Sequence, residues 1–339
     1  MNAHSIRQHV AVTATAGLLA LGQAWAAPAA KGPVKVFILA GQSNMEGHGI
    51  IKGGKKGTLE TLTTDPATAD RYKHLLGKDG GWAARDDVWL SYYGTKSPLT
   101  IGNSAAKGSI GPEIGFGWVV GDYLDEPVLL IKYGPGGTSL AGPWRPPSSG
   151  KAPGKNGERD RGPGVGDLYD GMIAGVKKQL ANLKTDFPEI GDRGYELVGF
   201  GWHQGWNDGC GMADTQAYEK NMINFIKDAR KDLGVPNLPF VIGGSGFGGW
   251  AQTVDRRLMI QAAQKAAANQ PEFKDDARFV ETRGFFRPAD QSPNRFGYHW
   301  NCNAETHYLV GEGMGLAMVE LLGGPKAPAN PTGPDEEKK

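Results

Sequence analysis

The stretch VKVFILAGQSNMEGHG, residues 34–49, decides how the fold of this chain is interpreted. Its first seven residues are almost continuously apolar, which is typical of a strand buried on both faces of a parallel sheet. A short polar turn flanked by glycine follows and places Ser43 where the strand ends. Ser43 can cap the helix that follows, or it can be a nucleophile held at the edge of the sheet. The rest of the sequence is needed to decide between these two interpretations.

Strand and helix signals alternate along the rest of the chain. Short apolar runs predict further strands at 127–134, 195–204, 239–244 and 277–283. Helical spacing predicts helices at 113–124, 167–183, 214–234, 253–270 and 304–323. About five alternations predict an α/β fold in which helices cover both faces of a central parallel sheet of about five strands.

Two long segments, 47–110 and 134–166, are rich in glycine and lack clear periodicity. We interpret them as loop insertions, the first of which contains one strand at 87–94. The sequence therefore predicts a single domain over residues 27–324. The remaining residues, 325–339, lack the apolar content to pack and are predicted to be a disordered tail.

The first 26 residues have the features of a secretory signal peptide. Arg7 precedes an apolar run that ends at Leu21, and the small residues Ala24 and Ala26 flank Trp25 in a cleavage-site pattern. The apolar run is too short to span a bilayer, and no later segment is longer and equally apolar. We therefore expect cleavage after Ala26 and a periplasmic or extracellular protein without membrane insertion.

The charge balance gives little reason to expect a charged partner. The chain has 37 Lys and Arg against 36 Asp and Glu, a net charge of +1, so nothing favours nucleic acid. No H-x-x-x-H or C-x-x-C spacing indicates a metal, and no cofactor is expected. A metal site formed by His203, Asp208 and His299 stays an alternative on the sequence alone.

Four polar segments follow predicted strands or precede the last helix, and all of them should meet at one edge of the sheet. They contribute Ser43, the glycine pair Gly136 and Gly137, Asn207 in WHQGWND, and His299 in GYHWN. Each of these residues also has an ordinary structural role open to it. Together they offer a hydroxyl, a base and fixed amide donors for an oxyanion, which is the set that acyl transfer requires.

The segments GQSN, GGTS, QGWND and HWN…LVG fall in the order and context of the SGNH hydrolase superfamily, which this sequence resembles. More narrowly, FILAGQSNMEG, GPEIGFG, KYGPGGTSLAGPW and WHQGWND resemble the sialate O-acetylesterase and acetylxylan esterase group of carbohydrate esterases. The resemblance extends over about residues 34–323. It implies a flavodoxin-like three-layer α/β/α fold and metal-free removal of O-acetyl groups from a carbohydrate.

The resemblance also implies roles for particular residues. Ser43 would be the nucleophile, and the amides of Ser43 and Gly137 with the side chain of Asn207 would form the oxyanion hole. His299 is preferred to His307 as the base, because a loop residue can reach Ser43 more readily. The residues expected to bind substrate are Gln42, Gln204, Trp206, Glu113 and Trp144.

The sequence departs from the family pattern at two positions. The family usually has an aspartate three residues before its histidine, where this chain has Phe296. Asp290 is the expected replacement, with Glu305 or a backbone carbonyl as alternatives. Related sequences often read QGE where this chain has Trp206 after Gln-Gly, so the indole would narrow the pocket or stack on a sugar.

The two cysteines lie beside the candidate segments. Cys210 follows Asn207 by three residues and Cys302 follows His299 by three, so we predict a disulfide between the oxyanion loop and the histidine loop. Two other functions remain open at this point. One is a general esterase or arylesterase, and the other is a non-catalytic glycan-binding protein, supported by the missing aspartate at position 296.

Overall fold

The computed structural model describes residues 32–154 and 157–328. Within these residues, the main sheet has seven strands in the order β4-β3-β6-β1-β7-β8-β9. The strands are β1 (Val34–Gly41), β3 (Ala84–Tyr92), β4 (Thr95–Thr100), β6 (Val128–Tyr133), β7 (Tyr195–His203), β8 (Phe240–Gly243) and β9 (Ala277–Val280). All neighbouring strands are parallel except β3 and β4. The predicted α/β fold is confirmed.

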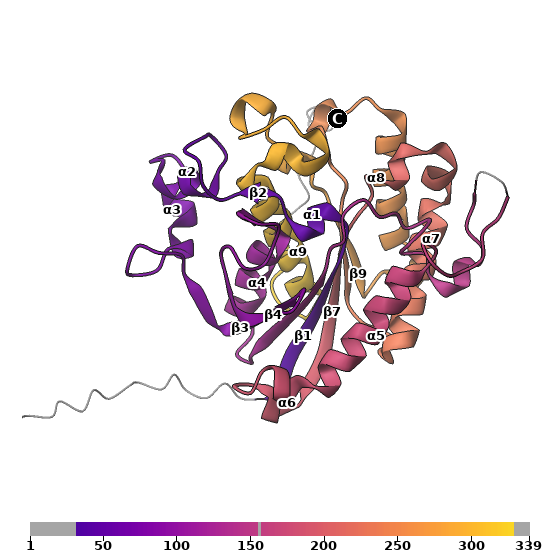
Figure 1. Ribbon diagram of the computed structural model, residues 1–339, viewed down its shortest axis with the longest axis horizontal. Helices are drawn as coiled ribbons and strands as arrows, with labels where there is room; N and C mark the ends of the chain where they lie inside the picture. The colour runs from indigo at the N-terminus through magenta and orange to yellow at the C-terminus, as the bar shows by residue number, and fades with distance from the viewer. Residues whose placement is uncertain (1–31, 155–156, 329–339) are drawn as a thin grey trace, which may run out of the picture. The chain divides into compact units, whose positions relative to one another are not determined.

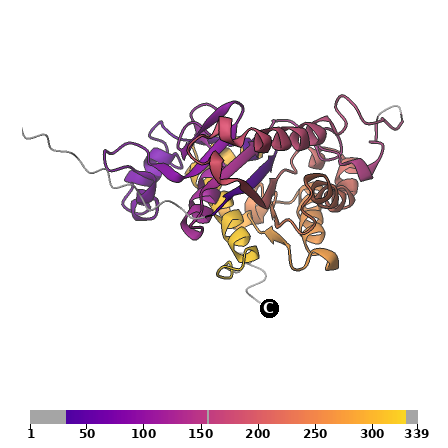
Figure 2. The same ribbon diagram turned by 90° about the horizontal axis from the view of Figure 1, so that it is seen from below.

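Helices cover both faces of the sheet (Figure 1). One face carries α4 (Pro112–Tyr123) and α9 (Ala304–Leu321), and the other carries α5 (Asp167–Ala181), α7 (Met212–Leu233) and α8 (Asp255–Ala268). Seen from below, α5 in magenta and α9 in yellow lie on opposite sides of the strands (Figure 2). The shorter elements are α1 (Ser43–Glu46), β2 (Gly49–Ile50), α2 (Leu59–Thr64), α3 (Ala69–Tyr72), β5 (Ser109–Ile110) and α6 (Leu183–Asp186).

The central position of β1 in the sheet explains why its sequence is mostly apolar. Val36 and Ile38 belong to the core between the sheet and α5, α7 and α8, while Phe37 and Leu39 belong to the core under α4 and α9. Successive side chains of a strand point to opposite faces, and both faces are covered here. The run at 34–40 is therefore apolar except at Lys35, which is also its one position that is not fully buried.

The contact between α4 and α9 requires glycine at its closest points. A Cβ atom added to Gly311 would overlap the carbonyl of Pro112, and one added to Gly115 would overlap the carbonyl of Tyr308. The two helix backbones can therefore approach closely. This packing fixes the start of α9, and with it the preceding segment that carries His299.

The segment 47–110 is more ordered than the sequence indicated. Besides β3, which was predicted, it contains β4, β2, β5 and two short helices. Strand β4 has the sequence TKSPLT and was missed because it is polar and contains Pro98. Proline is tolerated there because β4 is an edge strand.

Several sequence predictions cannot be compared with the structure. The predicted signal peptide and residues 329–339 of the predicted tail lie outside the described residues. Within the part that is described, no helix is both long and apolar enough to cross a membrane.

Candidate active site

Ser43 is the first residue of α1, directly after the carboxyl end of the central strand β1. The N-cap of this helix is Gln42, so Ser43 does not have the capping role that its sequence context also allowed. The first N–H groups of a helix have no acceptor within the helix, so the Ser43 amide can donate to a bound group. A Cβ atom added to Gly136 would lie 3.6 Å from the Ser43 Cβ, which places the loop after β6 alongside the serine.

Asn207 follows β7 and is oriented by Gln42. Gln42 Nε2 donates to Asn207 Oδ1 over 3.0 Å, and Gln42 Oε1 accepts from the Gly205 amide at 3.2 Å. This bond occupies the amide oxygen of Asn207 and leaves its Nδ2 group as a donor. Gln42 itself is buried, so its position supports a role in orienting Asn207 rather than in contacting substrate.

A buried carboxylate joins the loop after β7 to the loop after β6. Asp208 accepts hydrogen bonds from the amides of Leu140 and Ala141 at 2.9 and 2.8 Å, and from Gln204 Nε2 at 2.6 Å. Burial raises the pKa of Asp208 to about 6, against the effect of these donors. Gly137 lies at the exposed tip of the loop after β6, which Asp208 holds in place. Its φ of 70° is a conformation that favours glycine.

His299 lies in η9 (Gly297–Cys302), a 3₁₀ segment that contains a kink. Trp300, Asn301 and Cys302 have φ values of 54°, 56° and 55°, a run of left-handed conformations that is uncommon outside glycine. Asn44 Nδ2 donates to the carbonyl of Tyr298 over 2.8 Å. The residue after Ser43 is therefore bonded to the residue before His299.

The ring of His299 stacks on the ring of His48, with centroids 3.8 Å apart and planes at 5°. Glu46 Oε2 lies 3.7 Å from His48 Nε2, on the same short segment as Ser43. Burial and, to a smaller extent, His48 lower the pKa of His299 to about 4, although the charge of Glu46 acts in the opposite direction. His299 is therefore neutral near pH 7, which is the protonation state that a general base needs.

The described residues include no carboxylate that hydrogen-bonds to the His299 ring. Asp290, the expected acid, is exposed in η8 (Ala289–Gln291). Glu305 is bonded to Arg287 Nε at 2.6 Å and to the Tyr72 hydroxyl at 3.0 Å. Neither carboxylate orients His299, because Asp290 makes no hydrogen bond to its ring and Glu305 is bonded to Arg287 and Tyr72 instead.

His307 does not have the placement of a base that serves the same site. It is buried in α9, its Nε2 has no hydrogen-bond partner among the described residues, and burial lowers its pKa well below the usual range. This position favours His299 over His307, in line with the preference drawn from the sequence.

Two of the residues expected to bind substrate are structural. Glu113 is fully buried and pairs with Lys132 at 2.5 Å, and Lys132 Nζ also donates to the carbonyl of Glu46 at 2.8 Å. Trp144 is 1% exposed, and its Nε1 donates to Thr138 Oγ1 at 3.0 Å. The assignment of Glu113 and Trp144 to substrate contact is therefore wrong, because both side chains are enclosed by protein.

The remaining two candidates differ from each other. Gln204 is also buried, and it donates to Asp208 and to the carbonyl of Thr138 at 3.1 Å, so it holds the two loops together. Trp206 is only half-buried, with the Arg257 guanidinium 3.5 Å from its ring centroid. Trp206 is the member of the predicted set that can still face a substrate.

The predicted disulfide is not formed. Both cysteines are free thiols, Cys210 exposed and Cys302 buried. Cys210 Sγ is directed toward the carbonyl of Trp206 at 3.4 Å, while Cys302 is enclosed in the kinked segment, where burial raises its pKa. The prediction was based on the equal spacing of the cysteines from Asn207 and His299, which does not show that one side chain is exposed and the other buried.

The residues of the alternative metal site have other partners. His203 is buried with Nδ1 3.0 Å from the carbonyl of Gly243, and Asp208 is the loop clamp described above. Across residues 32–154 and 157–328, no group of three or more His, Cys, Asp or Glu side chains is placed to hold a metal ion.

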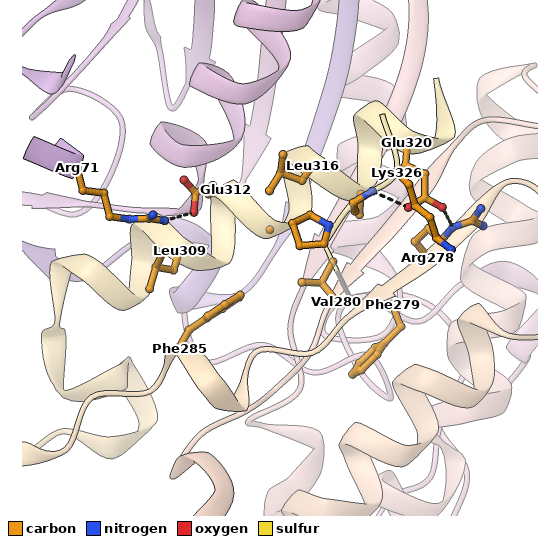
Figure 3. Close-up of a pocket in the computed structure, with 14 residues that line it drawn as sticks. Arg71, Arg278, Phe279, Val280, Phe285, Leu309, Glu312, Leu316, Glu320 and Lys326 are labelled. Atoms are coloured by element: carbon orange, nitrogen blue, oxygen red, sulfur yellow. Dashed lines mark hydrogen bonds and ion pairs between the residues drawn. The ribbon is translucent and has the colours of Figure 1, made fainter. Parts of the chain in front are cut away.

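A cavity of about 350 Å³ lies along α9 but includes none of the candidate catalytic residues (Figure 3). Apolar side chains such as Phe285, Leu309 and Leu316 line it. The ion pairs Arg71–Glu312 and Arg278–Glu320, at 2.6 and 3.0 Å, lie at its rim. We therefore do not associate this cavity with Ser43.

Comparison with known proteins identifies a family whose model covers most of this chain. Residues 33–315 match the family described as carbohydrate esterase, sialic acid-specific acetylesterase. The chain belongs to this family. It is therefore an ester hydrolase of the carbohydrate acetylesterase class.

Individual relatives are distant. A probable carbohydrate esterase from Arabidopsis thaliana is 26% identical over 213 residues, 62% of this chain and 68% of the relative. The X-ray structure of an Arabidopsis thaliana protein aligns with a TM-score of 0.54 and 18% identity, over 85% of this chain and 98% of that chain, which shows a shared fold. A carbohydrate acetylesterase from Xanthomonas citri aligns with a TM-score of 0.48 and 14% identity, over 85% of this chain and 56% of that chain.

Proposed function

We propose that this protein is an exported serine esterase that removes O-acetyl groups from a carbohydrate through an acyl-enzyme on Ser43. Family membership supports the substrate class. The observation that carries the mechanism is the double link between the serine helix and the histidine segment. Asn44 donates to the carbonyl of Tyr298 over 2.8 Å, and His48 stacks on His299 at 3.8 Å. Both links hold His299 against the segment that begins with Ser43.

In the acylation step, His299 takes the proton of the Ser43 hydroxyl while Oγ attacks the acetyl carbonyl carbon. The carbonyl oxygen becomes an oxyanion. The intermediate then breaks its bond to the sugar oxygen, which leaves with the proton held by His299. Water attacks the acetyl-serine in the same way, with His299 as base and then acid, and releases acetate and free Ser43.

Three donors would stabilise the oxyanion in this mechanism. They are the Ser43 amide at the start of α1, the Gly137 amide at the exposed loop tip, and Asn207 Nδ2. The Gln42 bond holds Asn207, and the bonds of Asp208 to the Leu140 and Ala141 amides hold the loop that carries Gly137. Preorganised donors of this kind each contribute about 10²–10³ in rate.

The imidazolium that forms on His299 needs stabilisation, because no aspartate occupies position 296. We assign this role to Glu46, which acts through His48 as a positioning residue. The carboxylate raises the pKa of His299, and His48 in turn lowers the pKa of Glu46. A charged Glu46 next to the stacked rings therefore favours the protonated form of His299 during the reaction.

The proposed nucleophile can be identified by covalent trapping. Incubation with an organophosphate that labels activated serines should attach one group to the peptide that contains Ser43. Labelling should be lost in Ser43→Ala and in His299→Ala, and kept in Ser148→Ala, since Ser148 is bonded to Asp228 on α7 instead. Label on another serine, or hydrolysis by Ser43→Ala at the wild-type rate, would contradict the proposal.

Two alternatives give different results in the same assays. A non-catalytic glycan-binding protein is favoured by Phe296 in place of the usual aspartate, and it would neither be labelled nor release acetate. A general esterase would hydrolyse aryl acetates but not acetylated sugars. Export is a proposal from residues 1–26, and N-terminal sequencing of the secreted protein should begin at Ala27.

A further inference from the structure

Phe296, which stands where the family pattern has an acid, exposes its side chain. The residue is 50% exposed, while its carbonyl accepts a hydrogen bond from the amide of His299 at 2.7 Å. The backbone of Phe296 therefore supports the histidine segment, but its ring is free to contact another molecule. Burial within the protein does not explain why a large apolar side chain occupies this position.

Two further aromatic rings connect Phe296 to the candidate active site. Tyr298 is 40% exposed, and its ring centroid lies 5.6 Å from that of Phe296 with planes at 23°. The Tyr298 ring is also 4.5 Å from the His299 ring and 5.7 Å from the Trp206 ring. Phe296, Tyr298 and Trp206 thus form an aromatic platform whose central ring, Tyr298, lies next to His299.

We propose that this aromatic platform binds the pyranose rings of an O-acetylated oligosaccharide, with at least two sugar residues in contact. The inference rests on the proposed esterase function and names its substrate as a chain rather than a single sugar. The C–H faces of a pyranose are apolar and flat enough to lie on an aromatic ring. The spacing of the Phe296 and Tyr298 rings is comparable to the length of one sugar residue.

The polar atoms of the platform are available for sugar hydroxyls. Among the hydrogen bonds made by the described residues, none uses the Tyr298 hydroxyl or the Trp206 indole N–H. Such amphipathic rings are suited to a ligand that has both apolar faces and hydroxyl groups. Arg257 covers one face of the Trp206 indole, and Phe247 packs against it edge-on, so the orientation of the ring is set in advance.

Because the aromatic platform lies next to His299, a carbohydrate is a better candidate for its ligand than a protein partner. A sugar chain whose acetyl ester is attacked at Ser43 must leave the site along its rim, and the platform lies next to the base. A docking protein would have no reason to depend on the number of sugar residues. Chain-length dependence of hydrolysis is therefore the property that separates the two occupants.

The test compares two reactions of the same enzyme, hydrolysis of 4-nitrophenyl acetate and acetate release from acetylated xylo-oligosaccharides of one to six residues. For the wild type, kcat/KM should rise with chain length up to at least three residues. In Phe296→Ala and Tyr298→Ala, the ratio of kcat/KM for acetylated xylotetraose to that for the aryl acetate should fall about tenfold. Phe296→Tyr should restore most of this ratio.

Tyr195→Ala is the matched control, because Tyr195 is 48% exposed but lies at the opposite end of its strand from the site. Its ratio should equal that of the wild type. Equal kcat/KM values for acetylated xylose and xylotetraose, or unchanged ratios in both platform variants, would overturn the inference while the esterase function stands. Failure to hydrolyse either substrate class would instead remove the proposed function, and the inference with it.

Discussion

The imidazole rings of His48 and His299 lie parallel, with centroids 3.8 Å apart. Burial of the His299 ring lowers its pKa, and the neighbouring His48 ring lowers it as well. The Glu46 carboxylate, 3.7 Å from His48, partly offsets this effect. Burial and the stack on His48 therefore keep His299 neutral over a wide pH range, while the charge of Glu46 stays near it.

The pH dependence of hydrolysis should reflect this stack. A base must be unprotonated to accept the serine proton, so activity is present above its pKa and lost below it. Because the pKa of His299 is lowered to about 4 from an ordinary value of 6.5, kcat/KM should be constant from pH 7 to pH 5 and should fall with an apparent pKa near 4. An inflection close to 6.5 would show that the ring is not in the environment described.

Replacing Glu46 by glutamine should affect both rate and pH profile. The substitution removes the charge that raises the pKa of His299, so the acidic limb should move to lower pH. The imidazolium formed during the reaction also loses stabilisation, and kcat should fall about tenfold, which corresponds to one pKa unit. Asp290→Asn is the control carboxyl variant and should leave both quantities unchanged. A large loss in that variant would identify Asp290 as the acid after all.

Asn207→Asp should reduce kcat by about 10²–10³ at nearly constant size. Aspartate keeps an oxygen that can accept the Gln42 bond, but it replaces the donor Nδ2 with a second acceptor. Stability measured by urea unfolding should change little, since the Gln42 interaction is retained. Wild-type kcat in this variant would contradict the assignment of Asn207 to the oxyanion hole.

The buried pair Glu113–Lys132 should prove important for stability. Lys132→Met leaves the Glu113 carboxylate buried without its partner, which should lower the free energy of unfolding by about 3–5 kcal/mol. It also removes the donor to the Glu46 carbonyl at the end of α1, so kcat should fall as well. The double variant Glu113→Met with Lys132→Met should recover much of the stability but not the activity. Equal stability of single and double variants would argue against this account.

The fold could be predicted from the sequence because its signals are local. The apolar run of β1, the helical spacing of α9 and the glycines of the rim loops each depend on a few neighbouring residues. Strand β4 escaped prediction because Thr95–Thr100 forms an edge and has neither the apolar run nor the alternation of a buried strand.

The parts of the site that could not be predicted depend on contacts between distant residues. Glu113 lies in a motif that suggested a substrate contact, and only its pairing with Lys132 makes it structural. The stacking of His48 on His299 joins residues from opposite ends of the domain, and no spacing in the sequence indicates it. The cysteine spacing was misleading for the same reason, because position along the chain does not give the direction of a side chain.

The central claim is that Ser43 attacks the acetyl ester with His299 as its base, and the most direct test is the rate of acetate release by Ser43→Ala. This variant should keep the folded structure, and its kcat/KM on 4-nitrophenyl acetate should fall at least about 10³-fold. The residual activity would come from the remaining hydrogen-bond donors. A folded Ser43→Ala protein that hydrolyses the ester at the wild-type rate would contradict the account.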